Sequence, residues 1–476
     1  MPVNTVHKDY NTWRPTWDKC RVFFAGEDAV KKKGEAYLKA PGGMDATKGV
    51  GKSRYARFKY MAKFFPAVSR SIEGYEGLVF RNDLAVNVHE NLLPVIENMT
   101  FTGVSLNAFA RRILVERALV GRYGELVDYI PGDGSGIGLS FSKGYKAEDI
   151  INWREVHMNG KPHLVLVVLT EEREKPPEEY DSDGFSVETY TSYRVLDLGD
   201  DPQNNPAYRV REFRIDGVAG QRQVGEDRYP TFMGDPIKEI PFKFHGVREN
   251  SPSIERPPSL DMVNLVQHDY HNSADQQWLL HMCSIPQHWR AGFDDVEGGV
   301  IELGGSVVWN ASKPDAKAGV SEPSGQSHGA FEKTIKDNRG EMAQLGASLL
   351  EQEKGGVEAS DTHRIRHSNR TSFLQAMVEV QSEGHTATLK WHGMFMGLSP
   401  NDIDAISAEL NKDYFAVAID HNQMQGLMEM YLGGRITKHT LFERLQAGEI
   451  ISSNETFDTY EEVLTEENAG LGDEVL

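Results

Sequence analysis

The spacing of hydrophobic and polar positions changes along the chain. Up to about Pro131, apolar residues recur mostly at helical intervals, as in SLNAFARRILVERALVGRYGELVDYI, where Phe109, Ile113 and Ala118 share one face. The glycines at 121 and 124 then indicate a break before a short strand, ELVDYI. The first part of the chain is therefore predicted to be largely helical, with a helix-turn-strand segment at its end.

From Gly132 to Val247 the pattern is that of β-structure. Short apolar-rich segments alternate with clusters of Gly, Pro, Asn and Asp, which is typical of strands joined by turns. The segments are IINWREV, HLVLVVL, ETYTSYRVLDL, AYRVREFRI and IKEIPFKFHGV. The loop PGDGSGIGLS opens this region; its glycines follow a dinucleotide-binding fingerprint only loosely and no helix pattern follows, so we interpret it as a turn.

After the proline-rich SPSIERPPS, helical spacing returns over two long segments. The first is SLDMVNLVQHDYHNSADQQWLLHMCSIP, which Pro286 ends, and the second is HGAFEKTIKDNRGEMAQLGASLLEQEK. Between them lie a β-rich insert, QHWRAGFDDVEGGVIELGGSVVWN, and a predicted loop, KPDAKAGVSEPSGQS. Two long helices that bracket a small β unit predict a stalk with a tip.

The last region begins with a polar, glycine-containing loop, EKGGVEASD, and continues as a helix from about Thr362 to Met396. Further helices are predicted near HNQMQGLMEMYLGG and over RITKHTLFERLQAGEII. The terminal SSNETFDTYEEVLTEENAGLGDEVL contains no Lys or Arg, which favours a solvated acidic end.

Composition narrows the possible functions. The formal net charge is -20, so tight overall binding to DNA is disfavoured, because affinity for phosphates comes from Lys and Arg that displace counterions. Two cysteines, Cys20 and Cys283, provide neither a disulfide framework nor a thiolate metal cluster. No leader pattern and no apolar run of membrane-spanning length is found, and the longest such run is LVLVVL. We expect a soluble protein.

One stretch, TKGVGKS, ends like a phosphate-binding P-loop. The motif requires an additional glycine where Ala46 stands, and a buried strand before it, whereas EAYLKAPGGMD is not a strand pattern. The segment SRYARFKYMAKFFP that follows is helical in pattern. We interpret Thr47 to Ser53 as a flexible basic loop leading into a helix, and a nucleotide-dependent enzyme remains the alternative.

Two groups of histidines are candidate metal ligands. His268, His271 and Asp275 share one face of the first long helix, but no further ligands are evident and the same pattern suits a packed helix. In HRIRH, His363 and His367 have the spacing of a zinc-protease helix, yet Arg364 stands where the glutamate base is required. Two interpretations of this segment remain: a local basic cluster that also includes Lys354, Arg366 and Arg370, or the solvated start of a helix. The sequence indicates no catalytic residue, cofactor site or metal ligand, and no enzyme.

In their order and spacing, several stretches resemble the portal proteins of tailed bacteriophages. These are SLNAFARRILVERALVGRYGELVDYIP, then IPFKFHGVRENSPSIERPPSLDMVNLVQHDYHNSADQQWLLHMCSIPQHWRAG, GEMAQLGASLL with THRIRHSNRTSFLQAMVEVQ, and GGRITKHTLFERLQAGEII. The resemblance extends from near Tyr37 to Ile451. Each motif is weak by itself, and the order of the stretches carries the similarity.

The resemblance implies an α+β portal fold with a mixed α/β wing, two long stem helices around a β-containing clip, and a helical crown. Its regions would be a wing (1–257), a first stem helix (258–285), a clip (286–327), a second stem helix (328–350), a tunnel loop (351–361), a long helix between wing and crown (362–396), and a crown with an acidic tail (397–476). Apolar positions expected to pack within or between subunits are Leu260, Val263, Leu265, Trp278 and Leu279.

The function implied is that of a ring of twelve copies at one capsid vertex, through which double-stranded DNA is packaged and ejected without sequence specificity. Implied partners are the terminase large subunit, a head-tail adaptor and the major capsid protein, and the location is the virion, assembled in the cytoplasm of a bacterial host. The residues expected to face DNA are Lys354, Gly355, Gly356, Arg364 and Arg366. Those expected to face the motor or adaptor are Trp289, Phe293 and Asp294, and a buried structural role for the two aromatic residues is the alternative. Another oligomeric virion component, an adaptor or scaffold, is the second alternative.

Overall fold

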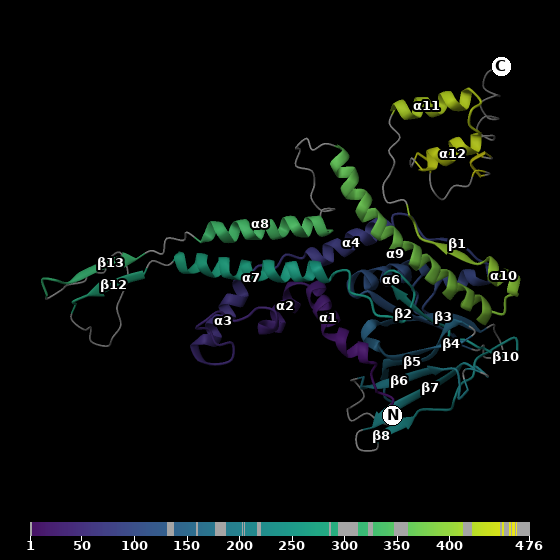
Figure 1. Ribbon diagram of the computed structural model, residues 1–476, viewed down its shortest axis with the longest axis horizontal. Helices are drawn as coiled ribbons and strands as arrows, with labels where there is room; N and C mark the ends of the chain where they lie inside the picture. The colour runs from purple at the N-terminus through teal and green to yellow at the C-terminus, as the bar shows by residue number, and fades with distance from the viewer. Residues whose placement is uncertain are drawn as a thin grey trace. The chain divides into compact units, whose positions relative to one another are not determined.

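The computed structural model describes residues 2–130, 138–158, 160–176, 187–201, 203, 205–216, 220–284, 287–293, 313–321, 327–346, 360–412, 421–447, 450–451, 457, 459–461 and 463. For 360–372 and 421–423 it describes the backbone alone. The chain divides into two compact units (Figure 1). Unit 1 comprises Met1–Thr12, Glu73–Glu255 and Val357–Leu476, and unit 2 comprises Trp13–Ile72 and Arg256–Gly356.

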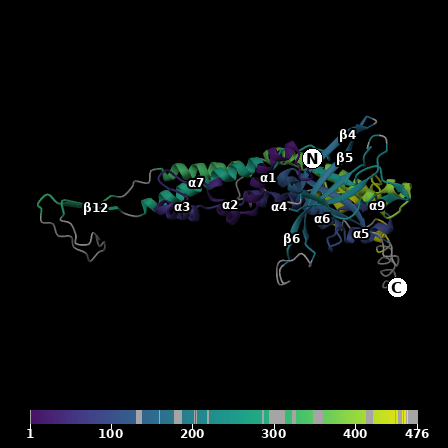
Figure 2. The ribbon, with the colours of Figure 1, turned by 90° about the horizontal axis from the view of Figure 1, so that it is seen from below.

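Unit 2 is built around two long helices that pack along each other, α7 (Leu260–Cys283) and α8 (His328–Leu345) (Figure 2). The beginning of the unit adds most of α1 (Lys8–Ala25), α2 (Glu27–Lys33), the short 3-10 turn η1 (Gly34–Ala36) and α3 (Gly49–Met61). Their buried side chains form one core, which includes Trp17, Phe23, Phe58 and Tyr270. The two long helices were predicted at 258–285 and 328–350, close to the bounds observed.

Between α7 and α8 the chain forms an antiparallel hairpin of β12 (Gln287–Ala291) and β13 (Lys317–Ser321). The order helix, β unit, helix is the one that the sequence pattern predicts. The prediction of a loop over KPDAKAGVSEPSGQS is wrong at β13. This segment contains Lys, Ala, Gly and Ser, which have little strand preference, and pairing with β12 gives it extended structure.

Among the described residues, unit 1 has two antiparallel sheets of three or more strands and two small two-stranded ladders. The larger has the order β4-β5-β6-β7-β8, with β4 (Ile150–Met158), β5 (Lys161–Glu174), β6 (Thr189–Asp197), β7 (Arg209–Asp216) and β8 (Gly220–Gln223). The smaller has the order β11-β2-β3, with β11 (Phe242–Gly246), β2 (Arg122–Ile130) and β3 (Leu139–Lys146). A separate small ladder joins β9 (Thr231–Phe232) to β10 (Asp235–Pro236). The β-rich character predicted for 132–247 is confirmed.

The helices of unit 1 cover the three-stranded sheet. The long helix α9 (Ser360–Phe395) lies across β11, β2 and β3 (Figure 1), and α6 (Leu106–Val120) packs on β2 and β11. The remaining elements are α4 (Ala67–Val79, which begins in unit 2), η2 (Glu90–Leu92), α5 (Leu93–Glu97), η3 (Ala147–Asp149), α10 (Pro400–Ala405), α11 (His421–Leu432), α12 (Lys438–Ala447), and the paired β1 (Ala85–Asn87) and β14 (Ser407–Glu409). The α+β class is confirmed.

The passage from α6 into β2 shows how the local sequence sets the fold. Ser105 caps α6 by accepting a hydrogen bond from the Ala108 amide, and Gly121 ends it in the left-handed conformation at φ 79°. The predicted break at Gly124 is wrong, because this glycine lies within β2. A β-carbon there would come within 2.4 Å of the Phe242 ring, so glycine allows β11 and its aromatic side chain to approach β2.

Candidate functional site

Few of the residues singled out from the sequence have side chains that the structure describes. Lys354, Gly355 and Gly356 lie outside the described residues, as does Asp294. The backbones of Arg364 and Arg366 belong to the first turns of α9, while their side chains lie outside the description. The side chains of Trp289 and Phe293 are described, and both belong to the β12–β13 hairpin region.

The hairpin presents an aromatic side chain to solvent. Trp289 on β12 pairs with Gly319 on β13, and 46% of its surface is exposed. A β-carbon on Gly319 would lie 2.9 Å from the indole, so the ring rests on the bare glycine backbone. The guanidinium of Arg290 stands 5.6 Å from the centre of the Phe293 ring. An exposed, positioned tryptophan next to an arginine is typical of protein-binding surfaces.

The helix pair of unit 2 buries a charged group where α7 meets α8. Asp269 on α7 is fully buried, and Arg339 on α8 lies 3.5 Å from its carboxylate and above the Phe65 ring at 4.8 Å. Burial raises the pKa of Asp269, and Arg339 opposes this shift. The contact fixes the register of the two helices, because a buried carboxylate without its cation is strongly destabilising.

The histidine arrangement on α7 does not form a metal site. His271 bonds through Nε2 to the Tyr37 carbonyl, and His268 is exposed. Across the part of the chain that the structure describes, no group of three or more His, Cys, Asp or Glu side chains is placed to hold a metal ion. The described helices likewise include none with the length and hydrophobicity required to span a bilayer.

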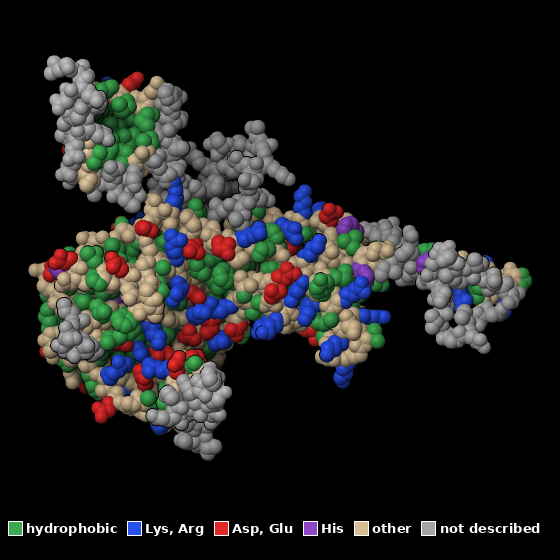
Figure 3. Space-filling view, turned by 180° about the vertical axis from the view of Figure 1, so that it is seen from behind, with side chains coloured by type: hydrophobic (Ala, Val, Ile, Leu, Met, Phe, Trp, Pro, Cys, Tyr) green, Lys and Arg blue, Asp and Glu red, His purple; other side chains and the backbone are tan. Residues whose placement is uncertain are grey.

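The P-loop-like stretch has no P-loop geometry. Helix α3 begins at Gly49, so Gly51 to Ser53 are helical, and the prediction of a flexible loop there is wrong. An Asp45 carboxylate oxygen accepts hydrogen bonds from the Thr47 and Lys48 amides and holds the turn just before the helix. The described chain just before α3 is turn and 3-10 helix, without the strand that a P-loop needs. Figure 3 shows Lys and Arg side chains gathered over α3.

The least expected arrangement lies between α9 and the three-stranded sheet of unit 1. We call it the buried histidine network: Glu125, Ser140, Ser142, His245, His385 and His392, together with Gln381 and Arg117, all buried. Glu125 of β2 is its centre. Its carboxylate accepts a hydrogen bond from Ser142 Oγ at 2.5 Å and faces His245 Nε2 at 2.9 Å. Four elements therefore meet at one buried carboxyl group.

The hydrogen bonds assign the histidine tautomers. Ser142 donates to Glu125, so His392 donates from Nε2 to Ser142 Oγ at 3.0 Å and accepts from Ser140 Oγ at Nδ1 at 2.8 Å. The Gln381 amide donates to His385 Nε2 at 3.2 Å, which places the proton of that ring on Nδ1. His385 and His392 are thus assigned as neutral, and each has a defined proton position.

Burial governs the protonation of the network. It lowers the pKa of His385 to about 3 and that of His392 to about 4, although Glu125 acts in the opposite direction. It also lowers the pKa of His245 well below its usual value, and nearby Arg117 adds to the effect. The pKa of Glu125 is raised by the same burial. The network therefore requires neutral imidazoles at physiological pH.

Arg117 links the network to α6 and to the end of β11. Its guanidinium donates to the Gly246 carbonyl at 2.6 Å and to Gln381 Oε1 at 2.8 Å, and the Gln381 amide donates to the Ala110 carbonyl at 2.8 Å. These contacts hold the middle of α9 in one position on the sheet. They anchor the helix that begins at Ser360, so the last two residues of the predicted tunnel loop (351–361) are helical and that boundary is wrong.

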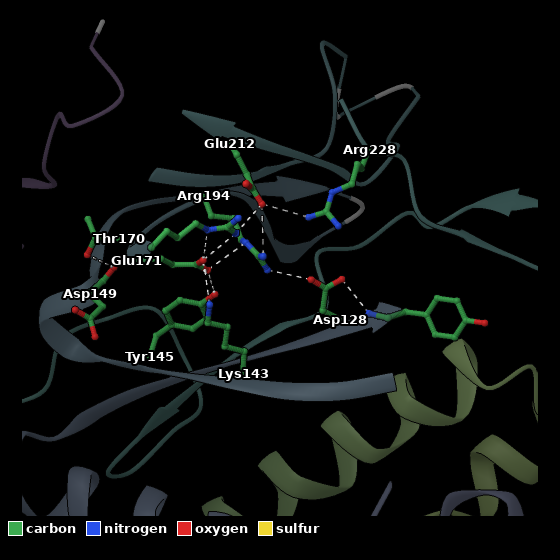
Figure 4. Close-up of polar contacts among 11 residues, drawn as sticks. Asp128, Lys143, Tyr145, Asp149, Thr170, Glu171, Arg194, Glu212 and Arg228 are labelled. Atoms are coloured by element: carbon green, nitrogen blue, oxygen red, sulfur yellow. Dashed lines mark hydrogen bonds and ion pairs between the residues drawn. The ribbon is translucent and has the colours of Figure 1, made fainter. Parts of the chain in front are cut away.

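A second polar cluster joins the two sheets of unit 1 (Figure 4). Arg194 on β6 forms ion pairs with Asp128 on β2 at 3.0 Å and with Glu171 on β5 at 3.2 Å. Glu171 also accepts from the Tyr145 hydroxyl at 2.5 Å and pairs with Lys143 at 3.0 Å. Burial alone would raise the pKa of Glu171, but Arg194 and Lys143 together lower it to about 2. The cluster connects the five-stranded sheet to the three-stranded sheet on which α9 packs.

Sequence reasoning missed both clusters. For the network there was a signal: Gln381, His385, Thr388 and His392 recur at spacings of 4, 3 and 4 residues, and all are buried on α9. Polar residues at core spacing in a helix with buried Met377, Val378 and Leu389 indicate a polar stripe that faces the core. For the Arg194 cluster, no local pattern distinguishes its members from surface charges on strands.

The chain is similar to one protein family in part of its length and to solved structures in its fold. A family described as Domain of unknown function (DUF4055) matches residues 258–396, less than half of the chain. The search of curated proteins found no match. Among solved structures, the chain is similar to a chain of the virion of a native gene transfer agent (GTA) particle, at 10% identity and a TM-score of 0.38, covering 88% of this chain and 98% of that chain.

Two further structures come from necks of such particles. One is the neck of an empty GTA particle computed with C6 symmetry, at 11% identity and a TM-score of 0.39, covering 87% of this chain and 98% of that chain. The other is the neck of a native GTA particle computed with C12 symmetry, at 11% identity and a TM-score of 0.38, covering 80% of this chain and 89% of that chain. The structural neighbours are thus chains of GTA virions and necks.

Proposed function

We propose that this chain is a portal protein, the subunit of a ring at one capsid vertex through which double-stranded DNA enters and leaves the particle. The observation that carries the proposal is the chain order of α7, the β12–β13 hairpin, α8 and α9. It is the order of first stem helix, clip, second stem helix and long helix that the sequence resemblance to phage portals implies. The portal would act as a passive channel, and the packaging motor would supply the energy.

Ring formation requires that different faces of one subunit meet across each interface. Unit 2 carries apolar side chains suited to such contacts. Leu280 and Met282 near the end of α7 are 39% and 40% exposed, and Leu345 at the end of α8 is 48% exposed. Burial of such side chains against a neighbouring copy would stabilise the ring by removing apolar surface from water. We propose a ring of twelve copies.

The charge of the chain suits a channel in which DNA must slide. Twelve copies would carry a formal charge of about -240, which disfavours tight contact with phosphates. Within the proposal, residues 351–361 form the loop nearest the DNA. Lys354, Arg364 and Arg366 contact the phosphate backbone of the DNA and make no sequence-specific contacts to the bases. Gly355 and Gly356 give this loop conformational freedom.

The hairpin supplies the docking end of the proposed portal. Its exposed Trp289, with Phe293 and Asp294 nearby, would contact the terminase large subunit during filling and a head-tail adaptor afterwards. The major capsid protein would surround the ring in the virion. Rigid anchoring of α9 through Glu125 and Arg117 supports this role, because the loop before α9 then starts from a fixed base.

Assembly of the purified full chain tests the proposal. Negative-stain images together with a mass measurement should show a closed ring with a central hole wide enough for a DNA duplex. Compact monomers under all conditions would exclude a portal. A closed assembly with no such hole would instead favour the alternative of a virion adaptor or scaffold. Turnover of ATP by the chain alone would favour the alternative of a nucleotide-dependent enzyme.

A further inference from the structure

Helix α3 lies in the most one-sidedly basic stretch of the chain. Between Asp45 and Glu73 the sequence contains seven Lys and Arg residues and no Asp or Glu, in a protein whose net charge is -20. The seven cations are Lys48, Lys52, Arg54, Arg57, Lys59, Lys63 and Arg70. Such a segregation of charge is not required for folding, because a solvated helix face is equally stable with mixed charges.

The structure turns this stretch into a surface. Tyr55 and Phe58 attach α3 to the core of unit 2, and the Tyr55 hydroxyl donates to the Leu38 carbonyl at 2.7 Å. On the remaining circumference, the side chains of Lys52, Arg54 and Arg57 are exposed. Two apolar side chains stand out among them, Tyr60 at 81% and Val50 at 71% exposed.

No described carboxylate forms an ion pair with the exposed cations of α3. Among the ion pairs between described residues, none involves Lys52, Arg54 or Arg57. The one carboxylate at the beginning of α3, Asp45, is engaged with the Thr47 hydroxyl and with backbone amides. The surface therefore keeps its full positive charge toward solvent.

We propose that α3 and the turn before it form a docking surface for an acidic protein partner. Arginine and tyrosine are enriched at protein interfaces, and Arg54, Arg57 and Tyr60 occur here within seven positions. Positive charge on an otherwise acidic molecule selects an acidic partner and orients its approach. The proposal does not depend on the portal function, since it follows from composition and exposure alone.

An acidic polypeptide fits this surface better than DNA does. A duplex carries one negative charge per about 1.7 Å and would extend from α3 over the remaining surface of a chain with net charge -20. A short acidic segment of a protein contacts α3 alone, whose thirteen residues span roughly 20 Å. Exposed Val50 and Tyr60 also provide apolar contacts that a phosphate backbone does not use.

Binding of labelled poly-L-glutamate to the purified full chain tests the proposal, with fluorescence anisotropy as the readout. The wild type should bind, more weakly as salt is added. The variant K52E/R54E/R57E should bind at least roughly tenfold more weakly, since three charge pairs are lost and three repulsions gained. The matched control R154E/K161E/K238E changes the net charge equally at three exposed cations of unit 1 and should bind within about twofold of wild type.

Several outcomes would overturn the proposal. Equal weakening in both triple variants would show an effect of net charge alone, and no weakening in either would show that α3 is not the site. Tighter binding of a short duplex DNA at α3 than of poly-L-glutamate would identify a nucleic-acid surface. The milder K52A/R54A/R57A variant separates binding from folding: if it keeps the wild-type circular dichroism spectrum and assembly and still binds like wild type, the proposal is wrong.

Discussion

His245 Nε2 lies 2.9 Å from a carboxylate oxygen of Glu125, and both side chains are completely buried. Such a pair in the interior is a directed hydrogen bond more than a salt bridge, because burial keeps the imidazole neutral by lowering its pKa. The same carboxylate raises the pKa of two more buried histidines, His385 and His392, and so opposes part of the lowering that burial causes. The contact between α9 and its sheet is therefore sensitive to protonation.

The first prediction is that stability falls as the pH is lowered through the unfolded histidine range. A histidine whose folded pKa is lowered binds protons better when unfolded, so unfolding becomes easier below about pH 6.5. The loss continues toward about 4 for His392 and about 3 for His385. Each histidine contributes up to about 1.4 kcal/mol per pH unit, and Glu125, whose pKa is raised, offsets at most one proton. Urea midpoints between about pH 7.5 and about pH 5 measure this.

A variant isolates the contribution of one ring. His385→Gln removes one titrating group and should reduce the steepness of the pH dependence by roughly a third. His157→Gln, at an exposed position on β4, should leave the steepness unchanged. Urea midpoints that stay level between neutral pH and about pH 5 would contradict the assignment of three neutral buried histidines.

The second prediction concerns Gly384, which faces His245 across the α9 interface. A β-carbon at this position would lie 2.8 Å from the imidazole, so Gly384→Ala should destabilise unit 1 by about 1–3 kcal/mol through forced displacement of the ring. The matched change Gly340→Ala in α8 meets no atom within 4 Å and should stabilise its helix by about 0.5–1 kcal/mol. Denaturant unfolding of both variants measures the change in the free energy of unfolding, which should be opposite in sign for the two. Equal changes would contradict the close approach of Gly384 to His245.

Local sequence patterns predict much of the fold. They do not predict pairing between segments that are far apart in the sequence. Helical periodicity and the prolines and glycines predict α7 to within a few residues and the start of α8 at His328, because each helix carries its own pattern over several turns. The predicted end of the second helix near Lys354 is wrong, because α8 ends at Leu345. Strands β1 and β14 were not predicted. Ala85 pairs with Glu409, and a three-residue strand has no period of its own to show.

The candidate site follows the same division. Trp289 could be named from the sequence as a candidate exposed aromatic residue. Its contact with Gly319 could not be predicted, because it depends on the pairing of β12 with β13, and the sequence predicted a loop at β13. The buried histidines were overlooked because polar residues on a helix are usually solvated. Their burial depends on α9 meeting β2 and β3, which are more than 200 residues away in the sequence.

The third prediction tests the cluster between the two sheets. Glu171→Gln keeps the shape of the side chain but removes the charge that faces Arg194 and Lys143, and should cost about 3–5 kcal/mol because a buried guanidinium loses a partner. Glu188→Gln makes the same chemical change in the more exposed pair with Lys175 and should cost at most about 1 kcal/mol. Urea unfolding compares them; similar losses would mean that the Arg194 cluster is not a buried support.

The last prediction links the hairpin to the proposed portal role. Trp289→Ala should leave stability and ring assembly almost unchanged, since much of the indole is already exposed. It should weaken binding of the terminase large subunit and of the head-tail adaptor by about 2 kcal/mol, roughly thirtyfold, as expected for an aromatic anchor. Calorimetric titration with each purified partner measures this. Tyr229→Ala, at a residue that is 50% exposed in unit 1, should leave both affinities unchanged.

A second change separates the position of the indole from its presence. Gly319→Val keeps Trp289 but places a β-carbon 2.9 Å from the ring, so the indole must leave its seat. If the hairpin acts as a rigid docking surface, this variant should lose affinity nearly as far as Trp289→Ala does, because the aromatic group is then presented in the wrong geometry. Wild-type affinity in both variants would show that the hairpin is not part of the interface and that the partners bind elsewhere on the chain.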